Sequence, residues 1–185
     1  TEDAIILSEA AKSDLEPAIE ALAITMNQFN AGASESGKII NTIAAGSKAG
    51  AGDIPYISQA MEKAGTTANL MNMSIEETVG AIETVAPYYK RAEMAGNSLD
   101  KVMLKMKANQ IGYKDGVFDF AFALDELERM YNSGTSAVDL FGVEHAKMGE
   151  LLVANKKEFI RYTDAVTGSN VAIEQATKNT NNNKA

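Results

Sequence analysis

Apolar residues recur at intervals of three and four along most of the chain, in short stretches that end at glycine, asparagine or a capping residue. The first clear stripe comprises Leu15, Ile19, Leu22, Met26 and Phe29. This spacing is that of one face of an α-helix. No heptad pattern persists through three or four repeats, which argues against a coiled-coil rod. The sequence therefore predicts an all-α protein, a compact multi-helix domain of about nine short helices.

Capping signals mark where several of these helices begin. Ser13 with Glu16, and Ser74 with Glu77, have the spacing of a capping box, in which two side chains satisfy free backbone N–H groups at a helix start. We therefore expect helices to begin at both places.

The glycine-rich segment AGSKAGAGDIP, residues 45–55, is where we expect a helix to stop. It follows the apolar stripe Ile39, Ile40, Ile43 and Ala44, and its three glycines fall within seven positions. Glycine in a helix interior is costly. Asp53 is the expected cap of the next helix, which has Pro55 in its first turn.

One stretch, NQIGYKDGVFDF, departs from the helical spacing. An Asp115-Gly116 pair separates two short apolar runs, which predicts one small β-hairpin near residues 111–118 with Gly116 at positive φ. Asp119 is the expected cap of the following helix.

A calcium loop is the alternative for this hairpin. An EF-hand with Gly116 at its sixth position needs oxygen ligands at Ile111, Tyr113 and Asp115. Isoleucine and tyrosine do not supply carboxylates, so the turn is the preferred interpretation and no metal site is predicted.

Composition excludes several classes of partner. The formal net charge is −8, and the lysines are scattered, which argues against nucleic acid and against an anionic membrane surface. There is no cysteine, hence no disulfide framework and no thiolate metal site. No apolar run approaches the roughly 18 residues of a membrane span. We expect no membrane contact by this segment.

The segment GASESGKI, from Gly32 to Ile39, matches part of a phosphate-binding loop. That loop requires a preceding strand and a Ser or Thr after the lysine. Here the preceding segment is helical, Ile39 replaces the hydroxyl residue, and Glu35 adds a negative charge. We expect a turn between two helices, and no cofactor.

No catalytic constellation is evident. His145 is the only histidine, and we expect it on a helix surface. Carboxylates that could be taken for a glycosidase pair are expected on solvated helix faces. These are Glu76 and Glu77, and Asp125, Glu126 and Glu128.

The nine methionines are expected mainly to fill the core, as at Met26, Met61 and Met103. The alternative is that some line an adaptable groove for a partner.

In the order and spacing of its segments, the chain resembles the core domain of phage tail tape measure proteins, also called the minor tail protein domain, over nearly its whole length. The segments that carry this resemblance are residues 22–65, 74–86, 95–106, 111–130 and 139–166. One departure is the segment YYKRAEMAGNSL, where a glycine-containing turn is usual. The chain keeps Lys90, Ala95 and Gly96 but has Arg91 and a longer spacing.

The chain is expected to have three parts. Residues 1–12, which read as helix from the start, are expected to form a helical lead-in that continues an upstream helix, and the asparagine-rich residues 179–185 a disordered tail. Residues 13–178 between them are the tape measure core domain that the resemblance implies.

The resemblance also implies a non-enzymatic structural role in tail assembly and tail-length determination, in the virion tail and, during assembly, in the bacterial host cytoplasm. Expected partners are other copies of the protein, tail tube, tail-tip or baseplate proteins, and tail assembly chaperones. The alternative function is a peptidoglycan hydrolase domain carried on a tail protein.

Overall fold

The computed structural model describes residues 2–11 and 15–183 of the 185-residue chain. The described part is all-α apart from one two-stranded antiparallel hairpin. Its first helices are α1 (Glu2–Ala11), α2 (Leu15–Gln28), α3 (Ser36–Ala49), α4 (Ile54–Leu70), α5 (Ile75–Val85) and α6 (Ala92–Ala108). The hairpin and the later helices are β1 (Tyr113–Lys114), β2 (Val117–Phe118), α7 (Phe120–Asn132), α8 (Ala137–Phe141), α9 (Ala146–Ala154), α10 (Lys156–Val166) and α11 (Val171–Asn183).

The all-α class and the hairpin are confirmed, but the described residues form eleven α-helices rather than about nine. Part of the difference arises after Gly142. The segment from there to Val166 divides at Asn155 into α9 and α10, because Asn155 Nδ2 donates to the carbonyl of Leu151 while its own carbonyl accepts from Glu158. Asparagine readily makes such local bonds, which compete with a continuous helix.

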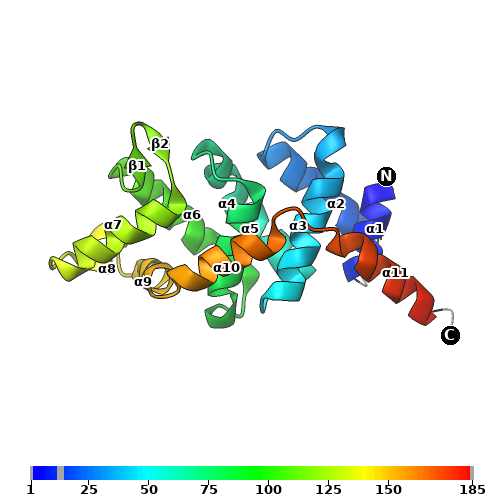
Figure 1. Ribbon diagram of the computed structural model, residues 1–185. Coiled ribbons are helices and arrows are strands. Elements are labelled where there is room, and N and C mark those ends of the chain that lie inside the picture. Colours follow the sequence, from blue (N-terminus) through cyan, green and yellow to red (C-terminus); the bar gives the residue numbers. More distant parts are fainter. Residues whose placement is uncertain (1, 12–14, 184–185) are drawn as a thin grey trace.

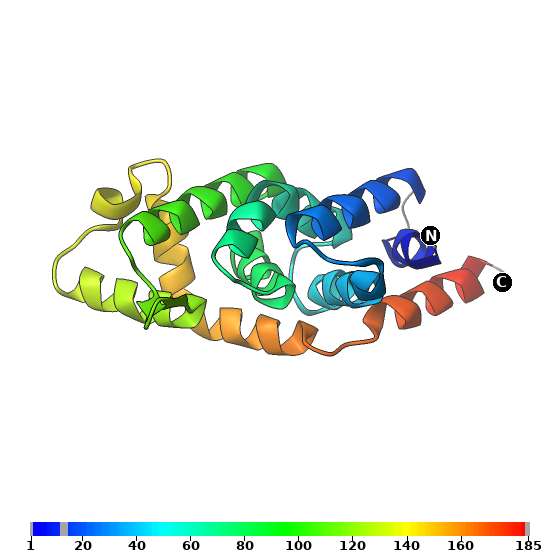
Figure 2. The ribbon, with the colours of Figure 1, turned by 90° about the horizontal axis from the view of Figure 1, so that it is seen from above.

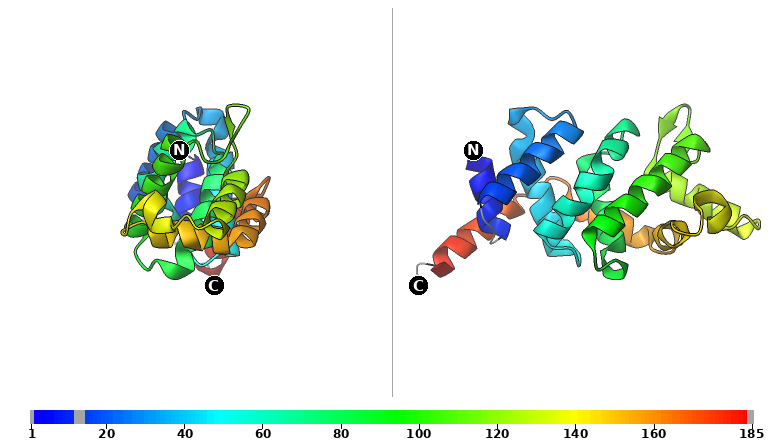
Figure 3. Two further views of the ribbon diagram at one scale, coloured as in Figure 1. Left: turned by 90° about the vertical axis from the view of Figure 1, so that its left-hand side faces the viewer. Right: turned by 180° about the vertical axis from the view of Figure 1, so that it is seen from behind.

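The helices pack in layers along an elongated molecule. Helices α2, α4 and α6 lie side by side in one layer, as Figure 3 shows from behind. Helices α3 and α5 pack against that layer, and α10 and α11 cover their opposite side (Figures 1 and 2). Helices α1, α2 and α11 form one end, and α7, α8 and α9 form the other.

Helix α5 lies at the centre of the core. All but one of its residues are buried, including Thr78, Glu83 and Thr84. A helix surrounded in this way by α3, α4 and α10 must satisfy its polar groups internally. Thr78 and Thr84 do so by donating to carbonyls one turn earlier.

Two glycines expected at or near turns lie inside helices instead. Helix α3 continues through Gly46 and ends at Ala49. A Cβ at Gly46 would stand 2.5 Å from Val79 Cγ1 of α5, so only glycine fits at this point of contact. Helix α6 begins at Ala92 and includes Gly96. At both positions the missing side chain allows two helices to approach closely, which compensates for the poor helix propensity of glycine.

The predicted caps on described residues are confirmed. Ser74 and Glu77 form a reciprocal capping box. Asp53 Oδ1 accepts from the Tyr56 N–H at 2.9 Å, and Asp119 Oδ1 accepts from the Phe122 N–H at 2.9 Å. The predicted box at Ser13 lies outside the described residues.

The hairpin turn is also confirmed. Asp115 and Gly116 have φ values of 52° and 79°, and strand β1 pairs with β2 in the register Tyr113 with Phe118 and Lys114 with Val117. Positive φ at both central residues is the signature of a type I′ turn.

The two ends of the described chain are helical and pack together. Ala4 and Leu7 of α1 are buried in the common core. Residues 179–183, expected to belong to a disordered tail, continue α11. Thr180 Oγ1 donates to Glu9 Oε2 at 2.6 Å, a tertiary contact that no local pattern in an asparagine-rich segment reveals.

Candidate functional site

The segment that resembles a phosphate-binding loop is a turn between two helices, as predicted. It follows α2 and passes through a short 3-10 helix, Ala33–Glu35, into α3. Glu35 Oε2 accepts the N–H of Gly32 at 3.0 Å, and Ile39 is buried. The amide that would face a phosphate is thus already bonded to a carboxylate of the same loop.

The carboxylates that we expected on solvated faces have several different roles. Glu76 is only 7 % exposed and pairs with Lys38 Nζ at 2.9 Å, so the expectation for Glu76 was wrong. The reason is that α5 is covered on all sides, and even its first turn contacts α3. Glu77 caps α5, whereas Glu128 is exposed.

The other two acidic residues of this group also have partners. Asp125 pairs with Lys156 of α10, and Glu126 accepts the N–H of Gly112. Within residues 2–11 and 15–183, no group of three or more His, Asp or Glu side chains could hold a metal ion.

His145 does not lie on a helix surface as we predicted. It precedes α9, its side chain is 26 % exposed, and its Nδ1 lies 3.1 Å from Ser98 Oγ of α6. The contact joins the start of α9 to the middle of α6. The expectation failed because residues 142–145 form a turn, through the bonds from the His145 and Ala146 N–H groups to the carbonyl of Gly142.

The methionines mainly fill the core, as predicted. Met61 and Met103 are fully buried, and Met26 is partly buried against the core. Met94 differs, because it is 52 % exposed on α6.

The most perturbed acidic residue was not identified from the sequence. Glu83 of α5 is fully buried, and its Oε2 accepts the N–H of Gly52 at 2.9 Å in the loop between α3 and α4. A Cβ at Gly50 would lie 2.0 Å from the same oxygen, so that glycine leaves room for the carboxyl group. No signal in the sequence indicated this burial, because three of the eleven residues of α5 are glutamates and Glu83 has the local pattern of a solvated position.

Burial raises the pKa of Glu83 to about 7. The backbone N–H groups of Gly52 and Ala51 lower this pKa, and the charge of Asp53 raises it. Glu83 Oε1 has no hydrogen-bond partner among the described residues. A protonated carboxyl group needs no compensating cation in this apolar setting.

Tyr56 interacts with Glu83 and is bonded in turn to the backbone of Tyr89. The Tyr56 hydroxyl donates to the carbonyl of Tyr89 at 2.6 Å, and burial first, then the charge of Glu83, raises the Tyr56 pKa to about 12. We interpret the bond from Gly52 to Glu83 as a structural link between α5 and the α3–α4 loop.

The candidate interaction site is a groove of about 240 Å³ between α2 and α4, with α1 contributing Leu7. Ala21, Ile24 and Pro55 provide apolar lining, and Glu20 and Glu62 provide the charge. The groove thus offers an apolar surface flanked by carboxylates, which suits an apolar side chain with a cation beside it.

Large apolar side chains are also exposed on several helices. On the layer of α2 and α6 these are Ile19, Met94 and Leu104, which are between 40 % and 52 % exposed. Exposed apolar residues that gather on one surface are typical of a site that contacts another protein.

The comparisons with known proteins identify one family. The family model described as phage-related minor tail protein matches residues 1–119. That match spans α1 to β2 and includes the groove. Neither the curated proteins nor the solved structures contain a match. In the described part of the chain, no helix is both long and apolar enough to cross a membrane.

Proposed function

Because the chain belongs to the family of phage-related minor tail proteins, we propose that it is a non-enzymatic structural and interaction domain of a tail tape measure protein, in a phage or a prophage. In this role it contributes to tail assembly and to the determination of tail length through contacts with other proteins. The virion tail is its site of action.

The observation that carries this proposal is the packing of short, capped helices in layers. A ruler must be extended, and 185 residues in one continuous helix would span roughly 280 Å. The longest helices here have 17 residues, each about 25 Å long, and they share one core. This supports a globular module attached to a ruler, whose contribution is contact rather than length.

The proposed partners are those that such a module can reach in a tail. They are other copies of the protein, the tail tube, tail-tip or baseplate proteins, and tail assembly chaperones in the host cytoplasm. The groove between α2 and α4 and the exposed apolar residues on α2 and α6 supply a surface for one of them.

Deletion of this segment from the full-length protein tests the proposal. We expect tail assembly to fail, or the assembled tails to keep their length, when measured by electron microscopy. A matched deletion of 185 residues from a long helical part of the same protein is the control, and it should shorten the tail by about 280 Å.

The opposite pattern would contradict the proposal that this segment is a globular module. If deletion of this segment shortened the tails by about 280 Å while assembly stayed efficient, the segment would itself be part of the ruler. Release of soluble fragments from purified peptidoglycan by the isolated chain would instead support the hydrolase alternative.

A further inference from the structure

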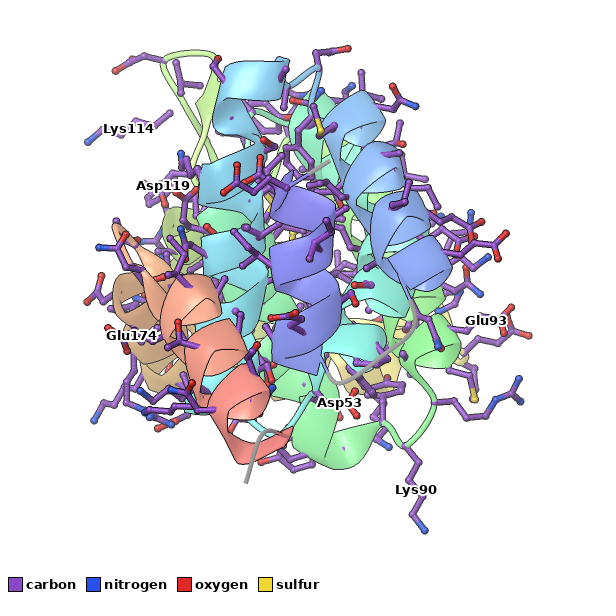
Figure 4. All side chains as sticks on the ribbon, turned by 90° about the vertical axis from the view of Figure 1, so that its right-hand side faces the viewer. Asp53, Lys90, Glu93, Lys114, Asp119 and Glu174 are labelled. Atoms are coloured by element: carbon purple, nitrogen blue, oxygen red, sulfur yellow. The ribbon has the colours of Figure 1, made fainter. Side chains whose placement is uncertain are left out.

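The layer of α2, α4 and α6 presents one continuous exposed surface. On each helix the exposed positions recur at a spacing of three or four, and they include Glu20 on α2, Glu62 on α4 and Lys101 on α6. Figure 4 looks onto the α1–α2 end of the molecule, with α2 and Glu93 of α6 on one side and Glu174 of α11 on the other. The surface is therefore distinct from the one formed by α10 and α11.

Charge is distributed unevenly over this surface. Helices α1 and α2 contain acidic residues and no lysine or arginine. At the opposite edge of the layer, residues 101–108 of α6 contain Lys101, Lys105 and Lys107 and no acidic residue. Glu93 and Asp100 precede these lysines in α6, and Lys101 Nζ lies 3.3 Å from Asp100 Oδ2. The edge formed by α1 and α2 is thus anionic, whereas the C-terminal half of α6 carries an excess of positive charge.

The groove between α2 and α4 matches the exposed side of α6 in chemistry. It combines Ile24 and Pro55 with Glu20 and Glu62. Ser58 Oγ, which also lines the groove, is buried and has no hydrogen-bond partner among the described residues. A buried hydroxyl group without a partner is costly, and a donor from outside the chain would remove that cost.

The exposed side of α6 supplies these complementary groups. Leu104 is 40 % exposed. Lys101, one turn before it, and Lys105, the next residue in the chain, are exposed as well. An apolar side chain with lysines nearby on the same helix is what the groove can receive.

We propose that the α2–α4–α6 layer is the interface between two copies of this chain, with α6 of each copy against the α2–α4 groove of the other. Because α2 and α6 flank α4 in one layer, a two-fold axis that runs parallel to α4, between α4 and α6, places each α6 over the α2–α4 groove of the other copy. Such an interface is isologous and closes at two copies.

The size of the layer is sufficient for this contact. Three helices of 14 to 17 residues are about 25 Å long and pack about 9 Å apart, so the layer offers roughly 700 Å² per copy. A standard stable interface buries about 800 Å² per partner. Glu62 lies close to the axis, where its own neighbour Lys63, at 3.3 Å, offsets the repulsion between the two copies.

Charge reversal tests the pairing. Sedimentation equilibrium at about 0.1 M salt is suitable, because the net charge of −8 on each copy is then screened beyond about 10 Å while close ion pairs remain. At concentrations up to about 0.5 mM we expect the unaltered chain to reach twice its mass of 19.7 kDa and no more. The variant Lys101→Glu/Lys105→Glu and the variant Glu16→Lys/Glu20→Lys should each associate about 100-fold more weakly.

An equimolar mixture of the two variants provides the decisive result. Each acidic α6 then meets a basic α2 and each basic α6 an acidic α2, so the mixture should recover the dimer. The matched control is Lys157→Glu/Lys178→Glu, which makes the same charge change on exposed residues of α10 and α11 and should leave the dimer intact.

Three results would overturn the proposal. They are a monomeric mass for the unaltered chain at every concentration, a mixture that stays monomeric, and a mass that grows beyond two copies. The inference concerns this surface alone and does not depend on whether the protein sets tail length.

Discussion

At the scale of single residues, Glu83 is the clearest case in which position determines chemistry. Its carboxyl group is buried in α5, and burial raises its pKa from 4.5 to about 7. The protonated form is therefore favoured in the folded protein. The stability gained from burying Glu83 in its protonated form is complete below about pH 4.5 and is lost as the pH rises through about 7.

The substitution Glu83→Gln should remove this pH dependence. Between pH 5 and pH 8 we expect the free energy of unfolding of the unaltered chain to fall by about 2 to 3 kcal/mol relative to that of the variant. Urea unfolding followed by circular dichroism at several pH values measures this difference. Glu128→Gln, at an exposed position of α7, is the control and should follow the unaltered chain. A Glu83→Gln variant with the same pH profile as the unaltered chain would contradict the assignment.

The hairpin turn provides a second prediction at this scale. Gly116 has a φ of 79°, and nothing lies within 4 Å of a Cβ built there. The cost of Gly116→Val is therefore one of backbone conformation, about 1 to 2 kcal/mol. We expect the melting temperature to fall by about 3 to 6 °C. Gly116→Asn should cost less, because asparagine tolerates the left-handed region; equal losses for both variants would argue against a turn-specific effect.

At the scale of elements, the contact of α4 with α6 depends on a glycine inside a helix. A Cβ at Gly96 would lie 2.5 Å from the carbonyl oxygen of Ala60 and 2.9 Å from its Cα. Both are backbone atoms of α4, so neither can move aside as a flexible side chain does. A side chain at this position would therefore push the two helices apart.

The substitution Gly96→Ala should therefore destabilise the protein by about 1 to 3 kcal/mol, although alanine is the better helix former. Thermal unfolding followed by circular dichroism measures the effect. Gly37→Ala in α3 is the matched control, because a Cβ there meets only Asp3 Oδ1 at 4.0 Å. That variant should be unchanged or up to about 1 kcal/mol more stable. A stabilising Gly96→Ala would mean that α4 and α6 can separate without cost.

At the scale of the whole molecule, the layers enclose α5. Helices α3, α4 and α10 contact it on different sides, and α10 comes from the far end of the sequence. By contrast, α1 and α11 lie at one end and contact mainly each other, α2 and α3. Local stability should therefore decrease from the centre toward that end.

Native-state hydrogen exchange measured by NMR tests this gradient. We expect amides of Val79 to Glu83 to exchange only through global unfolding, and amides of α11 to exchange through local opening at lower free energy. Exchange from α5 as fast as from α11 would show that α10 does not cover the central helix in solution.

The sequence by itself determined the features that depend on neighbours in the chain. The apolar spacing identified helices, capping residues marked where α4, α5 and α7 begin, and Asp115-Gly116 located the hairpin. These features were predictable because a cap or a turn is satisfied within about four residues. The resemblance in segment order also led to the tail protein family that the family model supports over residues 1–119.

Only the tertiary structure decided which polar residues are buried and which glycines lie inside helices. Glu83 resembles a solvated helix residue until α10 covers α5, and Gly96 resembles a turn residue until α4 contacts it. The groove between α2 and α4, and its placement in one layer with the lysines of α6, likewise depend on contacts between segments far apart in the chain. Burial and close approach are properties of such contacts, and local spacing does not contain them.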